Sequence, residues 1–312
     1  MRKQRIGLHK IALAALFTVG NTLIRYPWRQ GGQQAVVLLL ASAAVAVATV
    51  LFLYPLFRKI WRSPMSGRPF RSYAVAVLSV LLGAYALLCA WRSCWDYVEF
   101  STRLVLPQGS KILLAAVFLM CVGWLASLSA RGMDCFSLPA FLGVTVCILI
   151  LFAVGVGHFR WSDGIADLLQ WDRSVLTLLL TMWRESVLPL SVLALYFALT
   201  VPSEGARVMA VGVGIGCVLP LFCVVQGILT FGASYAAELE YPYSFAVRIL
   251  SVGQYFFRLE GFSYVVDYLS CLTRCAICVA TVRRLAMRFS PKSGRWVSVA
   301  ACALLFAFSL FQ

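Results

Sequence analysis

Long runs of hydrophobic residues, joined by short polar segments, repeat along the whole chain. Nine such runs cover residues 8–28, 33–57, 72–95, 111–130, 137–157, 174–200, 207–233, 262–283 and 296–311. Most have about 17 to 25 residues, the length of helix that crosses about 30 Å of hydrocarbon. Lipid offers no partners to free backbone groups, so these segments are expected to be helices. The pattern predicts an all-helical integral membrane protein with about nine spans, the last of them short.

The composition supports a membrane protein. Hydrophobic residues make up 62% of the chain and charged residues only 12%, unlike a typical soluble domain. The formal net charge of +15 could indicate a nucleic-acid-binding protein. Here, however, lysine and arginine flank the apolar runs rather than gathering on one hydrated face. We therefore expect membrane lipids as surroundings and no nucleic-acid partner.

The basic residues mark one side of the membrane, because they are concentrated in alternate joints. These joints contain Arg2, Lys3, Arg5, Lys10, Arg58, Lys59, Arg62, Arg68, Arg71, Arg131, Arg207, Arg283, Arg284, Arg288, Lys292 and Arg295. The opposite joints carry most of the acidic residues. The positive-inside rule places the basic side in the cytoplasm. With nine spans, the N-terminus is predicted to be cytoplasmic and the C-terminus outside.

Cysteine and histidine give no sign of a metal centre. The eleven cysteines are scattered, and although Cys271, Cys275 and Cys278 share a helical face, their spacing is not that of a zinc site. His9 and His158 fall near span ends. No P-loop, nucleophile elbow or H-E-x-x-H sequence is present. We expect no cofactor, no metal and no enzymatic activity. An alternative function, that of a membrane transferase, would need clustered acids or histidines.

Two predicted spans contain interruptions near their middles. The first breaks at Gly20 and Asn21, and the sixth carries Arg184, Glu185, Ser186 and Pro189. Transporters built from inverted repeats bind their ligands at such interruptions, because unwound backbone can solvate a ligand there. We therefore predict one polytopic domain of two repeats, at about 8–157 and 174–311, with the first and sixth spans in corresponding positions.

The break at Gly20 suits a carboxylate. The half-helix that follows would present unpaired N–H groups and a positive dipole end, and Thr18, Asn21 and Thr22 would lie beside the ligand. The alternative is that Gly20 serves only for close helix packing, with its polar neighbours bonded to local carbonyls.

Four ionisable residues lie within predicted spans, where each costs about 2.5 to 3.5 kcal/mol on insertion scales. Arg184 and Glu185 belong to the sixth span, and Asp267 and Arg274 to the eighth. Asp267 and Arg274 share a helical face about 10 Å apart, so we predict a charge network completed by Glu185 or Arg184. Asp267 would contact a coupling ion or a ligand amine. The alternative is a purely structural ion pair between helices.

The third span offers Gly83 and Tyr85 toward the first and sixth helices. The glycine would open space and the tyrosine hydroxyl would bond the ligand, although Tyr85 could equally belong to the core. Gly212, Gly214 and Gly216 in the seventh span are interpreted as helix-packing positions.

The segment 241–261 before the eighth span has an amphipathic pattern. Apolar residues recur at helical spacing at Phe245, Ile249, Val252, Phe256 and Leu259, with Arg248, Gln254 and Arg258 between them. This predicts an amphipathic helix on the outer surface. It would cap the bundle, and it could also act as a gate.

The stretch from Tyr241 to Phe262 resembles the segment before helix eight of spore germination permeases, and residues 241–268 carry most of the resemblance. These are the B subunits of nutrient germinant receptors, within the amino acid, polyamine and organocation transporter superfamily. The first-helix break ending at Pro27, the third span closing on residues 103–107 and the joint at 127–134 are similar in the same order. The resemblance covers most of the chain.

The resemblance implies two inverted five-helix repeats that hold a ligand between helices one, three, six and eight. The matching positions are Gly20, Asn21, Gly83, Glu185 and Asp267. It also implies assembly with a larger A subunit and a lipoprotein C subunit in the inner spore membrane, where the B subunit senses an amino acid or similar nutrient. The family has ten spans and this chain has nine, so packing against a partner is in doubt. The rival function is a secondary amino-acid or amine transporter coupled to Na⁺ or H⁺.

Overall fold

The computed structural model describes residues 2–22, 35–62, 69–161, 187–200, 205–239, 241–250, 259–289 and 294–310. Within these residues the chain is helical and contains no β-strand. Its elements are α1 (Arg2–Thr22), α3 (Ala35–Arg62), α4 (Pro69–Phe100), the π-helix η2 (Ser101–Val105), α5 (Lys111–Ser127), α6 (Ala130–Gly155), the 3₁₀ helix η3 (Val156–His158), α9 (Leu190–Thr200), α10 (Gly205–Phe231), α11 (Ala233–Glu238), α12 (Pro242–Ile249), α13 (Glu260–Phe289) and α14 (Gly294–Leu310).

Each predicted span contains an apolar helix, although residues 23–28 of the first span and 174–186 of the sixth lie outside the described part of the chain. Five of these helices, α3, α4, α6, α10 and α13, are long and apolar enough to cross a membrane. Shorter apolar helices occupy the other four predicted spans, in α1, α5, α9 and α14. The predicted fold class, an integral membrane bundle of helices, is confirmed.

Hydroxyl groups inside the spans donate hydrogen bonds to backbone carbonyls of their own helix. Thr18, Ser270 and Thr281 each donate to the carbonyl four residues earlier, over 2.9, 2.6 and 2.7 Å. Such bonds let a hydroxyl lie within hydrocarbon at little cost. At the helix starts, the hydroxyls of Ser110 and Ser129 accept bonds from the first turns of α5 and α6, which supplies partners that the helix itself lacks.

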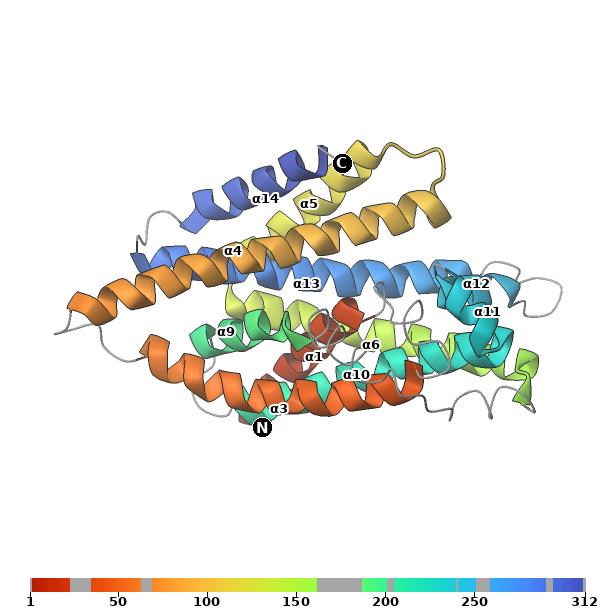
Figure 1. Ribbon diagram of the computed structural model, residues 1–312. Coiled ribbons are helices and arrows are strands. Elements are labelled where there is room, and N and C mark those ends of the chain that lie inside the picture. Colours follow the sequence, from red (N-terminus) through yellow and green to blue (C-terminus); the bar gives the residue numbers. More distant parts are fainter. Residues whose placement is uncertain are drawn as a thin grey trace.

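The helices form two groups that meet at α13. One group contains α1, α3, α9 and α10, and the other contains α4, α5, α13 and α14. Figure 1 shows α14, α5 and α4 on one side of α13, with α9, α1, α10 and α3 on the other side. Helix α13 contacts members of both groups, and 78% of its most apolar stretch is buried, against 28% for α3. The buried face of α13 therefore lies at the centre of the bundle.

Helix α1 packs closely against α10. A β-carbon at Gly212 would lie 2.6 Å from the Ile11 carbonyl oxygen, and one at Gly216 would lie 2.6 Å from that of Ala15. Both glycines are packing positions, as predicted. Gly214 is not, because a β-carbon there would meet nothing within 4 Å.

Helix α12 corrects the prediction for residues 241–261. It ends at Ile249, and Leu250 already has extended backbone angles; residues 251–258, which include Val252, Gln254, Phe256 and Arg258, lie outside the described part. The buried stripe also differs from the predicted one. Tyr243, Val247 and Leu250 are buried, whereas Ile249 is 55% exposed. The short helix is rotated so that a different set of residues faces the bundle.

The sixth predicted span contains an irregular segment, as expected from Pro189. Val187, Leu188 and Pro189 form a turn, and α9 begins only at Leu190. The amide of Ser191 bonds to the Leu188 carbonyl, and that of Val192 to the Pro189 carbonyl, both over 3.0 Å. Helix α1 ends at Thr22, inside the first predicted span.

Candidate functional site

Asp267 lies in the buried centre of the bundle, on α13, and only 4% of it is exposed. Helix α13 contacts α4, α1 and α12, so helices from both groups meet along its buried face. Among described residues, no hydrogen bond or ion pair of the Asp267 carboxylate is found. A buried carboxylate is costly in lipid, so Asp267 is a candidate ligand contact.

The hydroxyl of Tyr243 adds a second polar group beside Asp267. Tyr243 is 7% exposed, and its hydroxyl oxygen is buried without a hydrogen-bond partner within the described ranges. Buried polar groups are usually bonded, so each exception needs an explanation. The Asp267 carboxylate and the Tyr243 hydroxyl lie on helices that contact each other, and each is a group that could bind the ammonium group of a small ligand.

Arg274 lies seven residues after Asp267 on the same helix and is equally buried, with 4% exposed. Its Nη1 atom donates to the carbonyl oxygen of Gly20 over 3.3 Å. Gly20 is in the last turn of α1, where carbonyl groups lack partners in the helix and carry a partial negative charge. Arg274 therefore stabilises the end of α1 and holds it against α13.

At Gly20, α1 approaches α13 closely. A β-carbon at Gly20 would clash with the backbone carbonyl of Ser270, whose carbon atom would be 2.7 Å away. This contact supports the packing alternative for Gly20. Thr18, 3% exposed, also belongs to this buried region, and its hydroxyl bonds to the Ala14 carbonyl.

Tyr85 lies beside the irregular segment of the sixth predicted span. It is half-buried and lines an apolar groove of about 680 Å³ together with Thr49 and Phe52 of α3 and with Val187 and Ser191. The expected proximity of Tyr85 to the sixth span is thus present in the structure.

Gly83 is separated from this group. A β-carbon at Gly83 would lie 3.9 Å from the side chain of Leu285. Leu285 is 18 residues beyond Asp267 on α13. At 1.5 Å per residue this is about 27 Å along the helix. The structure therefore does not bring Gly83 and Asp267 together.

Arg184 and Glu185 lie outside the described residues, as do the side chains of Asn21 and Thr22. Their part in the predicted charge network stays a prediction. Within the part of the chain that is described, no group of three or more histidine, cysteine, aspartate or glutamate residues could hold a metal ion.

An aromatic cluster next to Asp267 was missed at the level of sequence. The ring of Tyr97 stacks on Phe118 with centroids 4.6 Å apart, and it lies 5.6 Å from Tyr268. Tyr97 follows Gly83 by fourteen residues, close to four helical turns, so both lie on a similar face of α4. That periodicity is the one signal that could have indicated Tyr97.

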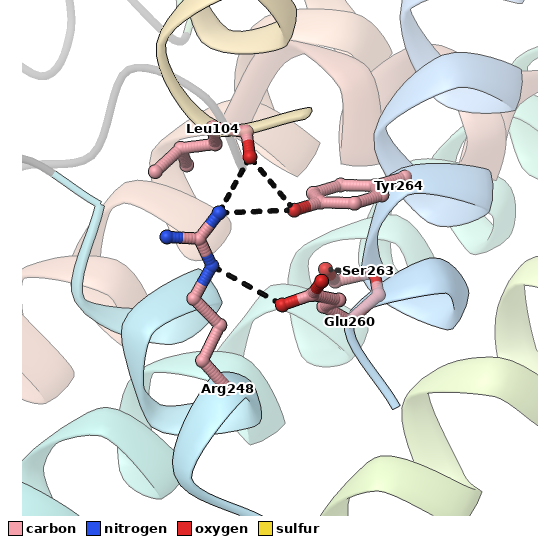
Figure 2. A network of polar contacts seen from close by, with 5 residues as sticks. All are labelled: Leu104, Arg248, Glu260, Ser263 and Tyr264. Carbon is pink, nitrogen blue, oxygen red and sulfur yellow. Dashed lines mark hydrogen bonds and ion pairs between the residues drawn. The ribbon is translucent and has the colours of Figure 1, made fainter. Parts of the chain in front are cut away.

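A second polar cluster lies where η2, α12 and α13 meet, and Figure 2 shows it. The Arg248 guanidinium donates to the Leu104 carbonyl and lies 3.4 Å from the Tyr264 hydroxyl. Its Nε atom is 3.3 Å from a Glu260 carboxylate oxygen. Arg248 thus connects α12 to both neighbouring elements, close to the buried Tyr243.

Comparison with known proteins identifies the fold but no family. No protein-family model and no curated protein matches the chain. Among solved structures, the chain is similar to MhsT in its complex with L-phenylalanine, with a TM-score of 0.67 and 15% identity over 98% of this chain and 78% of that one. The protein is an integral membrane bundle of helices with the fold of MhsT.

Proposed function

We propose that this protein binds a small amino acid or a similar amine-bearing nutrient at mid-depth in the membrane. The observation that carries the proposal is the burial of two polar groups, the Asp267 carboxylate and the Tyr243 hydroxyl, on helices α13 and α12, which contact each other. An ammonium group is the complement of this pair. The likeness to MhsT, solved with L-phenylalanine, supports the same ligand class. The ligand carboxylate would lie near the end of α1 and the residues that follow it.

The arrangement of helices supports a proposal of two repeats, at about 8–157 and 174–311. Helices α1 and α3 are grouped with α9 and α10, and helices α4 and α5 with α13 and α14. Each group thus contains corresponding helices from both proposed repeats. The basic joints support a cytoplasmic N-terminus and an outer C-terminus.

Ligand binding is tested with the full chain in lipid nanodiscs. Radiolabelled L-amino acids are screened by equilibrium binding, together with analogues that lack the ammonium group. Asp267→Asn is expected to weaken binding at least tenfold, or about 1.4 kcal/mol, while unfolding temperature changes little. The control is Asp134→Asn, because Asp134 is a half-buried acid of α6. Its backbone carbonyl contacts His9, and His9 lies about 16 Å from Gly20 along α1.

Two outcomes would contradict the binding proposal. One is the absence of saturable binding of any amino acid or amine by the wild-type chain. The other is equal binding of ligands with and without the ammonium group, because that would remove the role of Asp267.

Within this function we propose that the chain is the membrane subunit of a spore nutrient germinant receptor. The sequence resemblance at 241–267 supports this assignment, and the A subunit and the C lipoprotein would be its partners. Spores lacking the chain should then fail to germinate with the amino acid that binds, and the chain should co-purify with both partners. The rival, a transporter coupled to Na⁺ or H⁺, predicts instead gradient-driven uptake of that amino acid into liposomes containing this chain alone.

A further inference from the structure

An apolar groove runs along the surface between α5 and α14. Its volume is about 730 Å³. The residues that line it are Ala116, Leu119, Met120, Gly123, Trp124 and Ser127 of α5, Ser298, Val299, Cys302, Ala303 and Phe306 of α14, and Arg283 of α13. We call it the α5–α14 groove.

The groove has the length of one lipid leaflet. Its α5 residues recur at helical spacing from Ala116 to Ser127, eleven residues or about 16 Å. This is about half of the 30 Å of hydrocarbon in a bilayer. Met120 and Val299 are 67% and 62% exposed, so the groove is open to the surrounding lipid. A helix from a partner protein would be expected to follow the full length of a span, whereas an acyl chain needs one leaflet.

One end of the groove is polar and positively charged. Arg283 donates through Nη1 to the carbonyls of Ala126 and Ser127, over 3.0 and 2.7 Å, at the end of α5. Its Nε atom has no hydrogen-bond partner among described residues. The same holds for the hydroxyl of Ser298, which lines the groove and is only 5% exposed. Two donors at this end are therefore left without acceptors.

The chain after Arg283 carries only basic charges. Arg288, Lys292 and Arg295 follow Arg283 in the sequence, and no acidic residue occurs after Asp267. Trp124 and Trp296 are 63% and 76% exposed, as expected of aromatic residues at the membrane interface. Basic pockets between membrane helices bind anionic headgroups.

We propose that the α5–α14 groove binds an anionic phospholipid. One acyl chain lies along the stripe from Ala116 to Ser127, and the phosphate accepts hydrogen bonds from Arg283 and Ser298. The negative charge of the headgroup is what distinguishes the bound lipid from a zwitterionic one.

The proposal is tested by native mass spectrometry of the delipidated full chain, titrated with phosphatidylglycerol or phosphatidylcholine of the same acyl chains. Phosphatidylglycerol is expected to remain bound at about tenfold lower concentration, the effect of one charge-assisted contact. Arg283→Gln removes the charge, and Ala303→Trp fills the groove. Both should reduce retention of phosphatidylglycerol about tenfold. Arg160→Gln and Ala44→Trp, at exposed positions elsewhere, should leave it unchanged.

Three results would overturn the proposal. Equal retention of the two lipids would exclude recognition of the headgroup charge. Unchanged retention of phosphatidylglycerol in Ala303→Trp, which keeps the Arg283 bonds to α5, would place the lipid elsewhere. A second copy of the chain that is lost in Ala303→Trp while the lipid count stays the same would make the groove a protein interface.

Discussion

Arg274 donates from the middle of α13 to the carbonyl of Gly20 in the last turn of α1, over 3.3 Å. The bond joins two helices that are 254 residues apart in the chain. The same glycine is in close contact with the backbone carbonyl of Ser270 on α13. Gly20 of α1 is therefore held against α13, the helix that also carries Asp267.

Loss of the Arg274 guanidinium should destabilise the bundle. Arg274→Gln is expected to lower the free energy of unfolding by about 1.5 to 3 kcal/mol, because a charged donor to a buried carbonyl is removed. Thermal unfolding can be followed with a thiol-reactive dye, since Cys271, Cys275 and Cys278 are buried. Arg160→Gln, an exposed arginine, is the control. An equal shift in both variants would contradict a specific role for Arg274.

Gly20 should tolerate no larger residue. In Gly20→Ala the new methyl group would meet the backbone of Ser270, which cannot move as a flexible side chain does. We expect a loss of about 1 to 3 kcal/mol from this overpacking. Gly7→Ala on the same helix is the matched control, because a β-carbon at Gly7 meets nothing within 4 Å. Similar unfolding temperatures for the two variants would mean that α1 and α13 are not in close contact.

The glycines of α10 offer the same comparison on the opposite face of α1. Gly216→Ala would place a methyl group 2.6 Å from the Ala15 carbonyl oxygen and 2.7 Å from Cβ of Thr18. It should destabilise the protein by about 1 to 3 kcal/mol. Gly214→Ala meets open space and should be neutral or slightly stabilising, as alanine favours helix over glycine. The unfolding temperatures of the two variants decide this; a larger loss in Gly214→Ala would contradict the packing of α10 on α1.

The membrane-bundle fold class and the positions of the apolar helices could be predicted from sequence, because hydrophobic length determines which segments can cross a membrane. The burial of Asp267 and Arg274 could also be predicted, since ionisable residues in spans face the bundle interior. The irregular segment at Pro189 followed from proline chemistry. These features depend on one helix at a time.

The axial position of one helix against another could not be predicted in this way. Gly83 was placed beside Asp267, yet α4 and α13 pack so that Tyr97 takes this position and Gly83 faces Leu285. A periodic pattern defines the face of a helix but not its shift along a neighbour. The same limit applies to α12, where eight residues are too few for the pattern to distinguish Val247 from Ile249 as the inward residue.

The Arg248 cluster should control how firmly α12, which carries the buried Tyr243, is held against the bundle. In Arg248→Gln the Leu104 carbonyl loses its charged donor and Glu260 its ion-pair partner, so hydrogen exchange in 242–249 should accelerate. Arg248 and Glu260 are 34% and 30% exposed, and solvent screening limits their coupling to about 0.2 to 1 kcal/mol. A double-mutant cycle with Glu260→Gln measures it. Because Arg248 also bonds Leu104, Arg248→Gln should accelerate exchange more than Glu260→Gln does. The control is Glu238→Gln, since Glu238 is an exposed acid at the end of α11. This substitution should not accelerate exchange. Equal protection of α12 in all three variants would show that apolar burial alone retains the helix.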